Sequence, residues 1–227
     1  MVSFNRHRIR DHGAFWILLL GFTFFLINSC TSIWPLAKPL PFPTERMDLS
    51  VKYMRERHQL QVEQPFITPQ MIVVHWTAIP TFEASYQAFE PTILPGSRAG
   101  IAGASSLNVS AHYLIDQDGT IYQLMPETLF ARHTIGLNHC AIGIENVGDG
   151  GDHPLTEKQF RSNVRLIKRL LRQFDIGYVI GHHEYRQFED HPLWKEADKD
   201  YRTKKSDPGE LFMLRLRRKL KLSATFN

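Results

Sequence analysis

Two histidines and one aspartate stand where this 227-residue chain could bring metal ligands together. His75 ends the apolar run of residues 71–74, His182 follows the apolar run of residues 178–181, and Asp207 lies in a turn before a Pro-Gly pair. Two imidazoles and one carboxylate, with a fourth position open for water, are the ligand set of a catalytic zinc ion rather than a structural one. The three residues are far apart and no compact H-E-x-x-H helix joins them, so their spacing alone only suggests a metal site.

Each of these residues has an ordinary alternative. A histidine at the end of a buried strand is usually a core residue, and an aspartate before Pro-Gly is a common turn residue. His183 competes with His182, but successive residues of a strand point to opposite faces, so at most one of them can share a site with His75. Lys204 competes in the same way with Lys205 as the functional cation of the turn.

Glu145 interrupts an apolar segment of strand length, residues 141–147. A carboxylate is costly to bury in such a segment unless the protein uses it. Near a metal-bound water it could accept a proton during attack on a substrate and return that proton to the leaving group. Glu145 is therefore the candidate general base and acid.

The apolar pattern predicts the elements that must position these groups. Continuous apolar runs indicate buried strands at residues 71–77, 141–147 and 178–180. The segments 113–115 and 121–124 flank an Asp-Gly turn, which predicts a hairpin. A helix capped near Thr156 continues with helical spacing to Phe174, and a last helix covers about residues 210–222. This order predicts an α/β (α+β) domain with a central mixed sheet.

Five blocks of the sequence resemble the zinc-dependent N-acetylmuramoyl-L-alanine amidases of the type 2 family, which is related to the peptidoglycan recognition proteins. The blocks occur in the family's order over roughly residues 66–215, namely VVHWT at 73–77, SAHYLI at 110–115, IGIE at 142–145, GH at 181–182 and KSDPG at 205–209. One block alone would be weak evidence, whereas five in order argue against a chance match. The resemblance implies a single domain with a mixed β-sheet flanked by helices.

The resemblance also implies a role for each candidate residue. His75, His182 and Asp207 match the ligands of one zinc ion per chain, since the family's second histidine ligand directly follows a glycine. Glu145 and Lys205 match the catalytic residues, and the lysine faces the reacting carbonyl. The implied reaction is hydrolysis of the amide between N-acetylmuramic acid and the L-alanine of the stem peptide.

Other positions refine this expectation. His133 matches a substrate-binding position, with a structural hydrogen bond as the alternative, and His112 is expected to be mainly structural. Ala111 stands where phage-type relatives have a tyrosine, so the chain resembles the glutamate-dependent branch and an active member. Two other functions stay open: a metal-free peptidoglycan-binding module, and a zinc hydrolase acting on another amide.

The charge of the chain does not indicate a nucleic-acid partner. The formal net charge is +4, but Arg6, Arg8, Arg10 and Asp11 lie in an N-terminal segment expected to be removed. Without them 24 basic residues face 22 acidic ones, which leaves +2. That is no electrostatic footprint for DNA. The expected partners are peptidoglycan or muropeptide fragments, bound by a monomer.

The first 30 residues are typical of an export signal. A basic start precedes an uncharged, mostly apolar run over residues 14–27, which is too short for a comfortable bilayer crossing of about 20 residues. The run ends in LINSC, and this sequence resembles a bacterial lipoprotein box in which Cys30 is lipidated. We therefore expect a lipid-anchored protein on the periplasmic face of the outer membrane. An inner-membrane anchor and ordinary secretion are the alternatives.

The remaining chain divides into two parts. Residues 31–64 are predicted to form a proline-rich tether and a short helix, and residues 65–227 the catalytic domain. The segment 89–108 is rich in Gly, Ser, Ala and Pro and lacks periodicity, so we expect it to form one wall of a substrate groove. The long, aromatic and charged segment 184–202 is expected to contribute to substrate preference as well.

Overall fold

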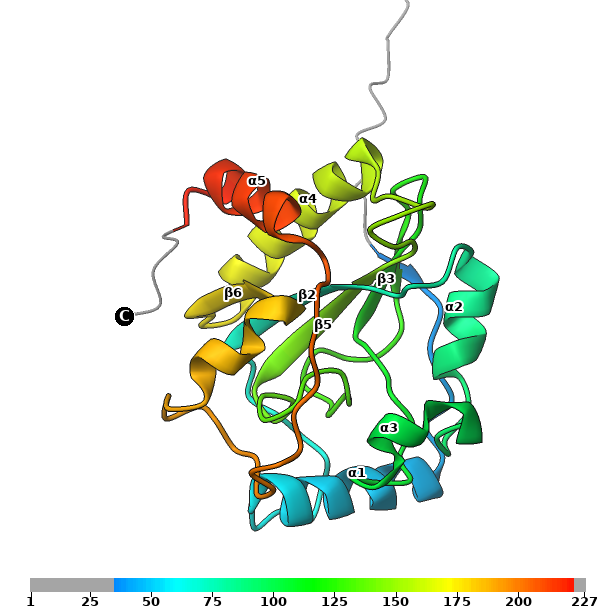
Figure 1. The fold of residues 1–227 in the computed structure, drawn as a ribbon, viewed down its shortest axis with the longest axis vertical. Coiled ribbons are helices and arrows are strands. Elements are labelled where there is room, and N and C mark those ends of the chain that lie inside the picture. Colours follow the sequence, from blue (N-terminus) through cyan, green and yellow to red (C-terminus); the bar gives the residue numbers. More distant parts are fainter. Residues whose placement is uncertain (1–34, 223–227) are drawn as a thin grey trace, which may run out of the picture. The chain divides into compact units, whose positions relative to one another are not determined.

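The computed structural model describes residues 35–222, so the predicted export signal and Cys30 lie outside the described residues. No helix within residues 35–222 is long and apolar enough to cross a membrane. The elements in chain order are β1 (Leu36–Ala37), α1 (Thr44–His58), β2 (Met71–Trp76), α2 (Phe82–Phe89), η1 (Gly96–Arg98), α3 (Ala99–Ala102), β3 (Tyr113–Ile115), β4 (Ile121–Gln123), β5 (Ala141–Asn146), α4 (Glu157–Gln173), β6 (Tyr178–Gly181), η2 (His182–Phe188) and α5 (Glu210–Leu220) (Figure 1).

The strands form one mixed sheet in the order β1-β4-β3-β5-β2-β6. Strand β2 lies between β5 and β6 and runs parallel to both. Strand β3 is parallel to β5 and antiparallel to β4, its predicted hairpin partner. The predicted fold class, a central mixed sheet with helices around it, is confirmed. Because β2, β5 and β6 are parallel, their carboxyl ends meet at one edge of the sheet.

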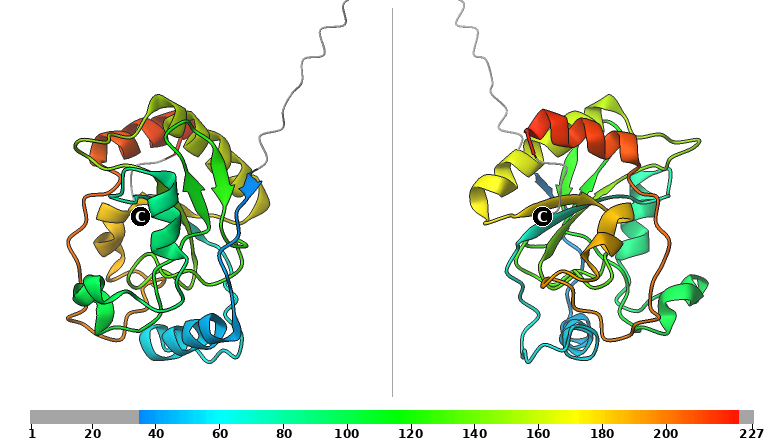
Figure 2. Two further views of the ribbon diagram at one scale, coloured as in Figure 1. Left: turned by 90° about the vertical axis from the view of Figure 1, so that its right-hand side faces the viewer. Right: turned by 60° about the vertical axis from the view of Figure 1, so that its left-hand side comes forward.

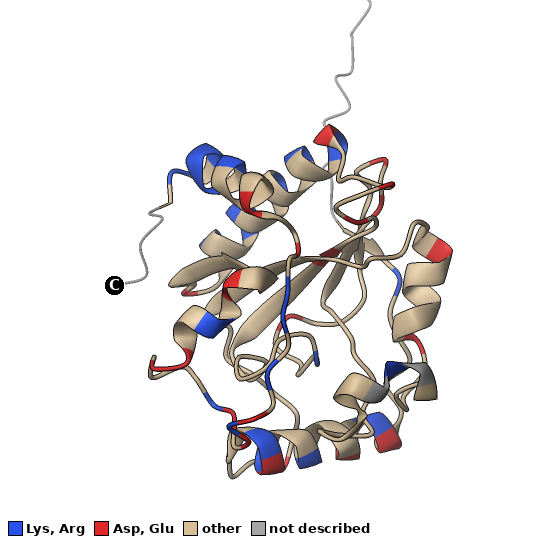
Figure 3. Cartoon of the chain, viewed as in Figure 1, with Lys and Arg blue, Asp and Glu red and all other residues tan. Residues whose placement is uncertain are grey.

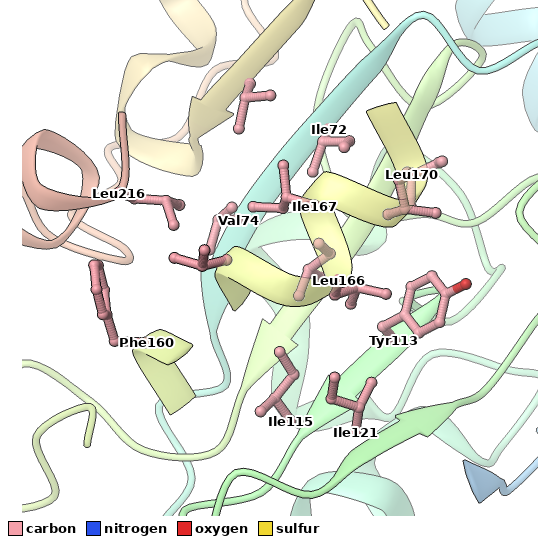
Figure 4. Packing of buried hydrophobic residues seen from close by; sticks show 14 of the residues in the cluster. Ile72, Val74, Tyr113, Ile115, Ile121, Phe160, Leu166, Ile167, Leu170 and Leu216 are labelled. Carbon is pink, nitrogen blue, oxygen red and sulfur yellow. The ribbon is translucent and has the colours of Figure 1, made fainter. Parts of the chain in front are cut away.

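Helices α4 and α5 cover one face of this sheet (Figures 1 and 2). Ile167, Leu170 and Leu216 are fully buried against Ile72 and Val74 of β2 (Figure 4). Burying one such side chain contributes roughly 1.5–3 kcal/mol, so this layer is a major source of stability. Helix α4 begins where the sequence predicts. Its start is a capping box in which Thr156 and Gln159 exchange hydrogen bonds between side chain and backbone.

Lys and Arg residues are frequent along α4 and α5 (Figure 3). The last turn of α5 carries Arg217, Arg218 and Lys219. Positive charge is favourable there, because the unpaired carbonyl groups give a helix a negative C-terminal end.

The N-terminal part of the described chain packs on the domain. Strand β1 pairs with β4, and Leu40 is buried, so residues 35–43 are extended but do not form a free tether. Helix α1 buries Tyr53 and Met54 against Ile67 and neighbouring apolar residues. Helix α2 was not predicted from the sequence; it is capped by Thr81, whose hydroxyl accepts a hydrogen bond from the Ala84 N–H at 3.3 Å.

Candidate active site

His75 is placed at the carboxyl end of β2 by a fully buried apolar strand. Its backbone carbonyl accepts a hydrogen bond from Asn146 Nδ2 at 2.9 Å, and Asn163 Nδ2 donates to Asn146 Oδ1 at 2.7 Å. This buried chain of amides ties β2 to β5 and α4. The register pairs His75 with Glu145 of β5, which brings the candidate base beside the first candidate ligand.

His182 follows β6, but it does not continue the strand as the sequence predicts. The chain turns at Gly181, and His182 is the first residue of η2. Glu184 fixes this turn, because its Oε2 accepts the Gly181 N–H at 2.7 Å and the buried Arg217 guanidinium pairs with the same oxygen. A Cβ at Gly181 would lie 2.7 Å from the His183 ring, so only glycine fits.

Asp207 is joined to η2 through its backbone. His183 N–H donates to the Asp207 carbonyl at 2.9 Å, and His183 Nδ1 lies 3.0 Å from the same oxygen. His183 therefore supports the turn, and the turn geometry rather than strand alternation separates it from His182. The Asp207 carboxylate is buried and approaches both His182 and His75.

The three candidate ligand atoms form a small triangle. The His75 Nδ1 lies 2.9 Å from His182 Nδ1, and Asp207 Oδ2 lies 3.2 Å from the former and 3.0 Å from the latter. Hydrogen bonds cannot account for all three of these short distances, because a neutral imidazole carries one N–H proton and that proton cannot be shared among all three atoms. A tetrahedral zinc with bonds of about 2.0–2.1 Å separates its ligands by about 3.3 Å. The donor set and its spacing therefore fit one zinc ion.

The charge states of these groups also suit a cation. Burial lowers the pKa of His182 to about 4, with a further contribution from His75, so its imidazole is neutral at pH 7. Burial alone would raise the pKa of Asp207, but the charges and hydrogen bonds of His182 and His75 hold it well below its ordinary value. Neutral imidazole and ionised carboxylate are the forms that bind metals.

His133 determines which nitrogen of His75 is free for a metal. The His133 Nε2 lies 3.2 Å from the Ala141 carbonyl, which can only accept a hydrogen bond. We assign the proton to that nitrogen, which leaves His133 Nδ1 as an acceptor that His75 Nε2 at 3.1 Å shares with the Thr134 hydroxyl at 2.9 Å. The lone pair of His75 Nδ1 then faces the triangle. Such outer partners commonly orient metal-binding histidines.

The surroundings of His133 are built for this contact. A Cβ at Gly143 would lie 2.9 Å from the His133 ring, so glycine makes room for it on β5. His112 lies close by and has both ring nitrogens engaged, accepting from Gly143 N–H at 2.9 Å and donating to the Leu129 carbonyl at 2.8 Å. His112 therefore has the structural role expected from the sequence.

The triangle opens into a pocket of about 210 Å³ whose lining includes Glu145, Lys205, Arg98 and Trp76. Glu145 is 8% exposed, and no described residue forms a hydrogen bond with its Oε2. Burial raises its pKa to about 7, against the opposing effect of His75. A carboxyl group that titrates near neutral pH in a pocket is suited to proton transfer.

The structure separates the two competing lysines. Lys205 lines the pocket, whereas Lys204 is exposed to solvent. A smaller cavity of about 50 Å³ adjoins the pocket and shares Lys205, His133 and His182 with it. The structure thus brings His75, His182, Asp207, Glu145, Lys205 and His133 together around connected cavities.

Several residues of the site were not singled out from the sequence. Arg98 reaches the pocket from the segment 89–108. Arg132 is 3% exposed and donates to the carbonyls of Ser105 at 3.1 Å and Ile101 at 2.7 Å. The position of Arg132 directly before His133 is the sequence signal that could have pointed to it, whereas Arg98 lies in a segment without any pattern.

The comparisons with known proteins show the family and the fold of the chain. The family model described as N-acetylmuramoyl-L-alanine amidase matches residues 65–210. Among proteins with curated descriptions, none matches the sequence significantly. The solved structure of N-acetylmuramoyl-L-alanine amidase LysC from Clostridium intestinale is similar with a TM-score of 0.53 and 20% identity, covering 84% of this chain and 100% of LysC. At that identity the likeness shows the fold.

Two further solved structures are more distantly similar. The amidase AmiD from E. coli, in complex with an anhydro-N-acetylmuramic acid peptide substrate, has a TM-score of 0.47 and 21% identity, covering 73% of this chain and 62% of AmiD. AmpDh3 from Pseudomonas aeruginosa has a TM-score of 0.49 and 22% identity, covering 74% of this chain and 66% of AmpDh3.

Proposed function

The chain belongs to the N-acetylmuramoyl-L-alanine amidase family, and we propose that it is a zinc-dependent member that cleaves the amide between N-acetylmuramic acid and L-alanine in the peptidoglycan stem peptide. The observation that carries the zinc proposal is the buried triangle of His75 Nδ1, His182 Nδ1 and Asp207 Oδ2. These three residues would hold one zinc ion. When bound, zinc supplies a Lewis acid and a water of lowered pKa.

Glu145 would handle the proton of the reaction. Its Oε2 has no hydrogen-bond partner among the described residues, and its side chain lines the pocket beside His75. In its ionised form it can accept the proton of the attacking water, and in its protonated form it can donate that proton to the departing alanine nitrogen. Burial favours the protonated form of this carboxyl group, and a bound zinc ion would favour the ionised form, so both forms can take part in the reaction.

Lys205 would stabilise the negative charge that develops on the carbonyl oxygen. Its side chain lines both the pocket and the adjoining cavity. A fixed cation in a buried site stabilises a developing oxyanion more strongly than it would in water. His133 acts one step further away, because it holds His75 in the tautomer whose Nδ1 is free.

Peptide release from purified peptidoglycan tests this proposal. The full-length chain should liberate peptides with a free L-alanine amino group and leave muramic acid intact; chelation should abolish the release, and zinc should restore it. Lys205→Met should lower the rate by about 10²-fold or more, and the adjacent exposed Lys204→Met is the matched control. Binding to the wall without release under any metal condition would instead support a binding module, and other new termini would indicate a hydrolase of another amide.

We also propose that the enzyme acts in cell-wall turnover or recycling while anchored to the outer membrane through lipidated Cys30. The support is the sequence of residues 1–30, with its basic start, apolar run and lipoprotein-box-like end. Fractionation of cells that express the full-length chain tests the anchor. Wild type should be recovered with the outer membrane and Cys30→Ala should not, whereas equal recovery of both would rule out lipidation at this residue.

A further inference from the structure

Helix α1 lies outside the residues 65–210 that the amidase family model matches, yet its two ends contact the two segments that border the active-site pocket. In Figure 1 it runs along the lower edge of the domain, with α3 near one end and the chain after η2 near the other. One of these segments is residues 91–105, which supplies Arg98 and Ile101 to the pocket. The other is residues 195–205, which ends in Lys205.

The first turn of α1 holds the segment 91–105 at its start. Arg46 is 1% exposed, and its Nη2 donates to the carbonyls of Phe89 at 3.1 Å, Glu90 at 2.7 Å and Pro91 at 2.6 Å. These carbonyls end α2, where a cation is favourable. No carboxylate of residues 35–222 forms an ion pair with Arg46, and burial lowers its pKa. The guanidinium is therefore held by the backbone that it orders.

The last turn of α1 holds the segment 195–205. Arg57 Nη2 lies 2.6 Å from the buried Glu196 Oε1 and 3.6 Å from Asp198 Oδ2, and its guanidinium stacks over the Tyr201 ring at 4.8 Å. The Arg57 carbonyl accepts the Ala197 N–H at 2.9 Å. The segment is therefore fixed by an ion pair, a ring contact and a backbone hydrogen bond, all from one residue of α1.

The middle of α1 contacts the cavity itself. Tyr53 is 1% exposed and lines the cavity of about 50 Å³ together with Tyr201 and Lys205. The Arg132 guanidinium lies 5.3 Å above the Tyr53 ring, and its Nη2 donates to the Ile101 carbonyl at 2.7 Å and lies 3.3 Å from the Tyr201 hydroxyl. Both pocket walls thus meet over the centre of α1.

We propose that α1 is a brace that fixes the separation of segments 91–105 and 195–205 and thereby determines how tightly the active site holds its substrate. The twelve residues from Arg46 to Arg57 span about 16 Å along a helix, so one rigid rod connects both walls. The role in substrate binding rests on the proposed amidase function. The mechanical role, holding the two segments, does not.

Hydrogen–deuterium exchange on the full-length chain tests the mechanical role without substrate. Arg46→Met should raise exchange in residues 91–105 about tenfold and leave residues 195–205 unchanged, and Arg57→Met should do the reverse. Lys52→Met removes a cation from the exposed side of the same helix and is the matched control. Arg46→Lys and Arg57→Lys should restore part of the protection. Equal exchange in wild type and both Met variants, or the same increase in the control, would overturn the brace.

Steady-state kinetics on a soluble muropeptide tests the role in binding. Arg46→Met should raise KM about tenfold and keep kcat within about twofold, because the segment 91–105 carries no residue assigned to the chemical step. Arg57→Met should raise KM as well and also lower kcat, because the segment 195–205 ends in Lys205. Zinc affinity should stay the same. If kcat falls instead and KM is unchanged, α1 does not set substrate binding. If wild type releases no peptide at all, the proposed amidase function fails, and the exchange experiment still decides whether α1 holds the two segments.

Discussion

Replacing Glu145 by glutamine should inactivate the enzyme and, in the metal-free protein, stabilise its fold at alkaline pH. The carboxylate is buried beside His75, and its Oε2 has no partner among the described residues. A buried charge without partners costs free energy, so the fold would be more stable without it. Catalysis, in contrast, requires this unpaired carboxylate, because a group that exchanges a proton with the substrate must not be hydrogen-bonded to another residue. The substitution therefore separates a catalytic role from a structural one.

The pKa of Glu145 sets the size of the effect. Burial raises this pKa from 4.5 to about 7, so the folded state holds the proton more tightly than the unfolded chain. The stability that the protonated group contributes is complete below the unfolded value of 4.5 and is lost as pH rises through 7. The whole difference corresponds to about 3.4 kcal/mol. Between about pH 5 and about pH 8.5, Glu145→Gln should gain about 2.5 kcal/mol relative to wild type.

Urea denaturation of the chelated protein at the two pH values measures this gain, and peptide release with zinc should fall by about 10²–10⁴-fold. Glu127 is a matched control, since it is also 8% exposed but accepts hydrogen bonds from Tyr113 Oη and from Gln123 Nε2 at 3.1 Å. Glu127→Gln should lower stability and spare activity. If Glu145→Gln also lowered stability at both pH values, Glu145 would be a structural residue and the reasoning would be wrong.

Three further changes test other parts of the structure. Zinc at about 100 times its Kd should raise the free energy of unfolding by about 2.7 kcal/mol, and His182→Ala should abolish this gain in a thermal melt. Arg217→Met should destabilise the fold by about 3–5 kcal/mol because it leaves the Glu184 carboxylate buried without its guanidinium, and adding Glu184→Gln should recover most of the loss in urea denaturation. Burial, reinforced by His139, lowers the pKa of His58 to about 3. As pH falls from about 7.5 to about 5, wild type should therefore lose about 2 kcal/mol more stability than His58→Gln in urea denaturation. Equal losses in the two proteins would show that His58 is protonated in the folded state at the lower pH.

The sequence predicts the elements whose pattern is strong. The parallel strands are continuous apolar runs, and α4 has both helical spacing and a capping box, so their positions agree with the structure within one or two residues. Helix α2 has little pattern, because Ser85 and Phe89 are its only buried residues. The contacts of α1 were not predictable either. They run from Arg46 and Arg57 to carbonyl groups and acids that are distant in sequence, and no periodicity reports such contacts.

The candidate ligands show a different limit. His75, His182 and Asp207 come from two strand ends and one turn, so only the topology, with β2 between β5 and β6, explains why they meet. Their assignment from sequence depended on a family resemblance and not on spacing. The choice of His182 over His183 agrees with the observed geometry, although the expected strand alternation does not occur after Gly181.

Glu145 and Asn146 show what separates a polar residue that serves the fold from one that is available for chemistry. They are consecutive in β5 and both are buried, so sequence and burial treat them alike. Asn146 is fully engaged, donating to the His75 carbonyl and accepting from Asn163, and it therefore holds the strand ends in place. Glu145 has an oxygen without a partner in the described chain and lines the pocket instead. Asn146 stabilises the edge of the sheet, so the Glu145 carboxylate beside it can stay without a hydrogen-bond partner. One short strand therefore provides both a rigid support and a reactive group.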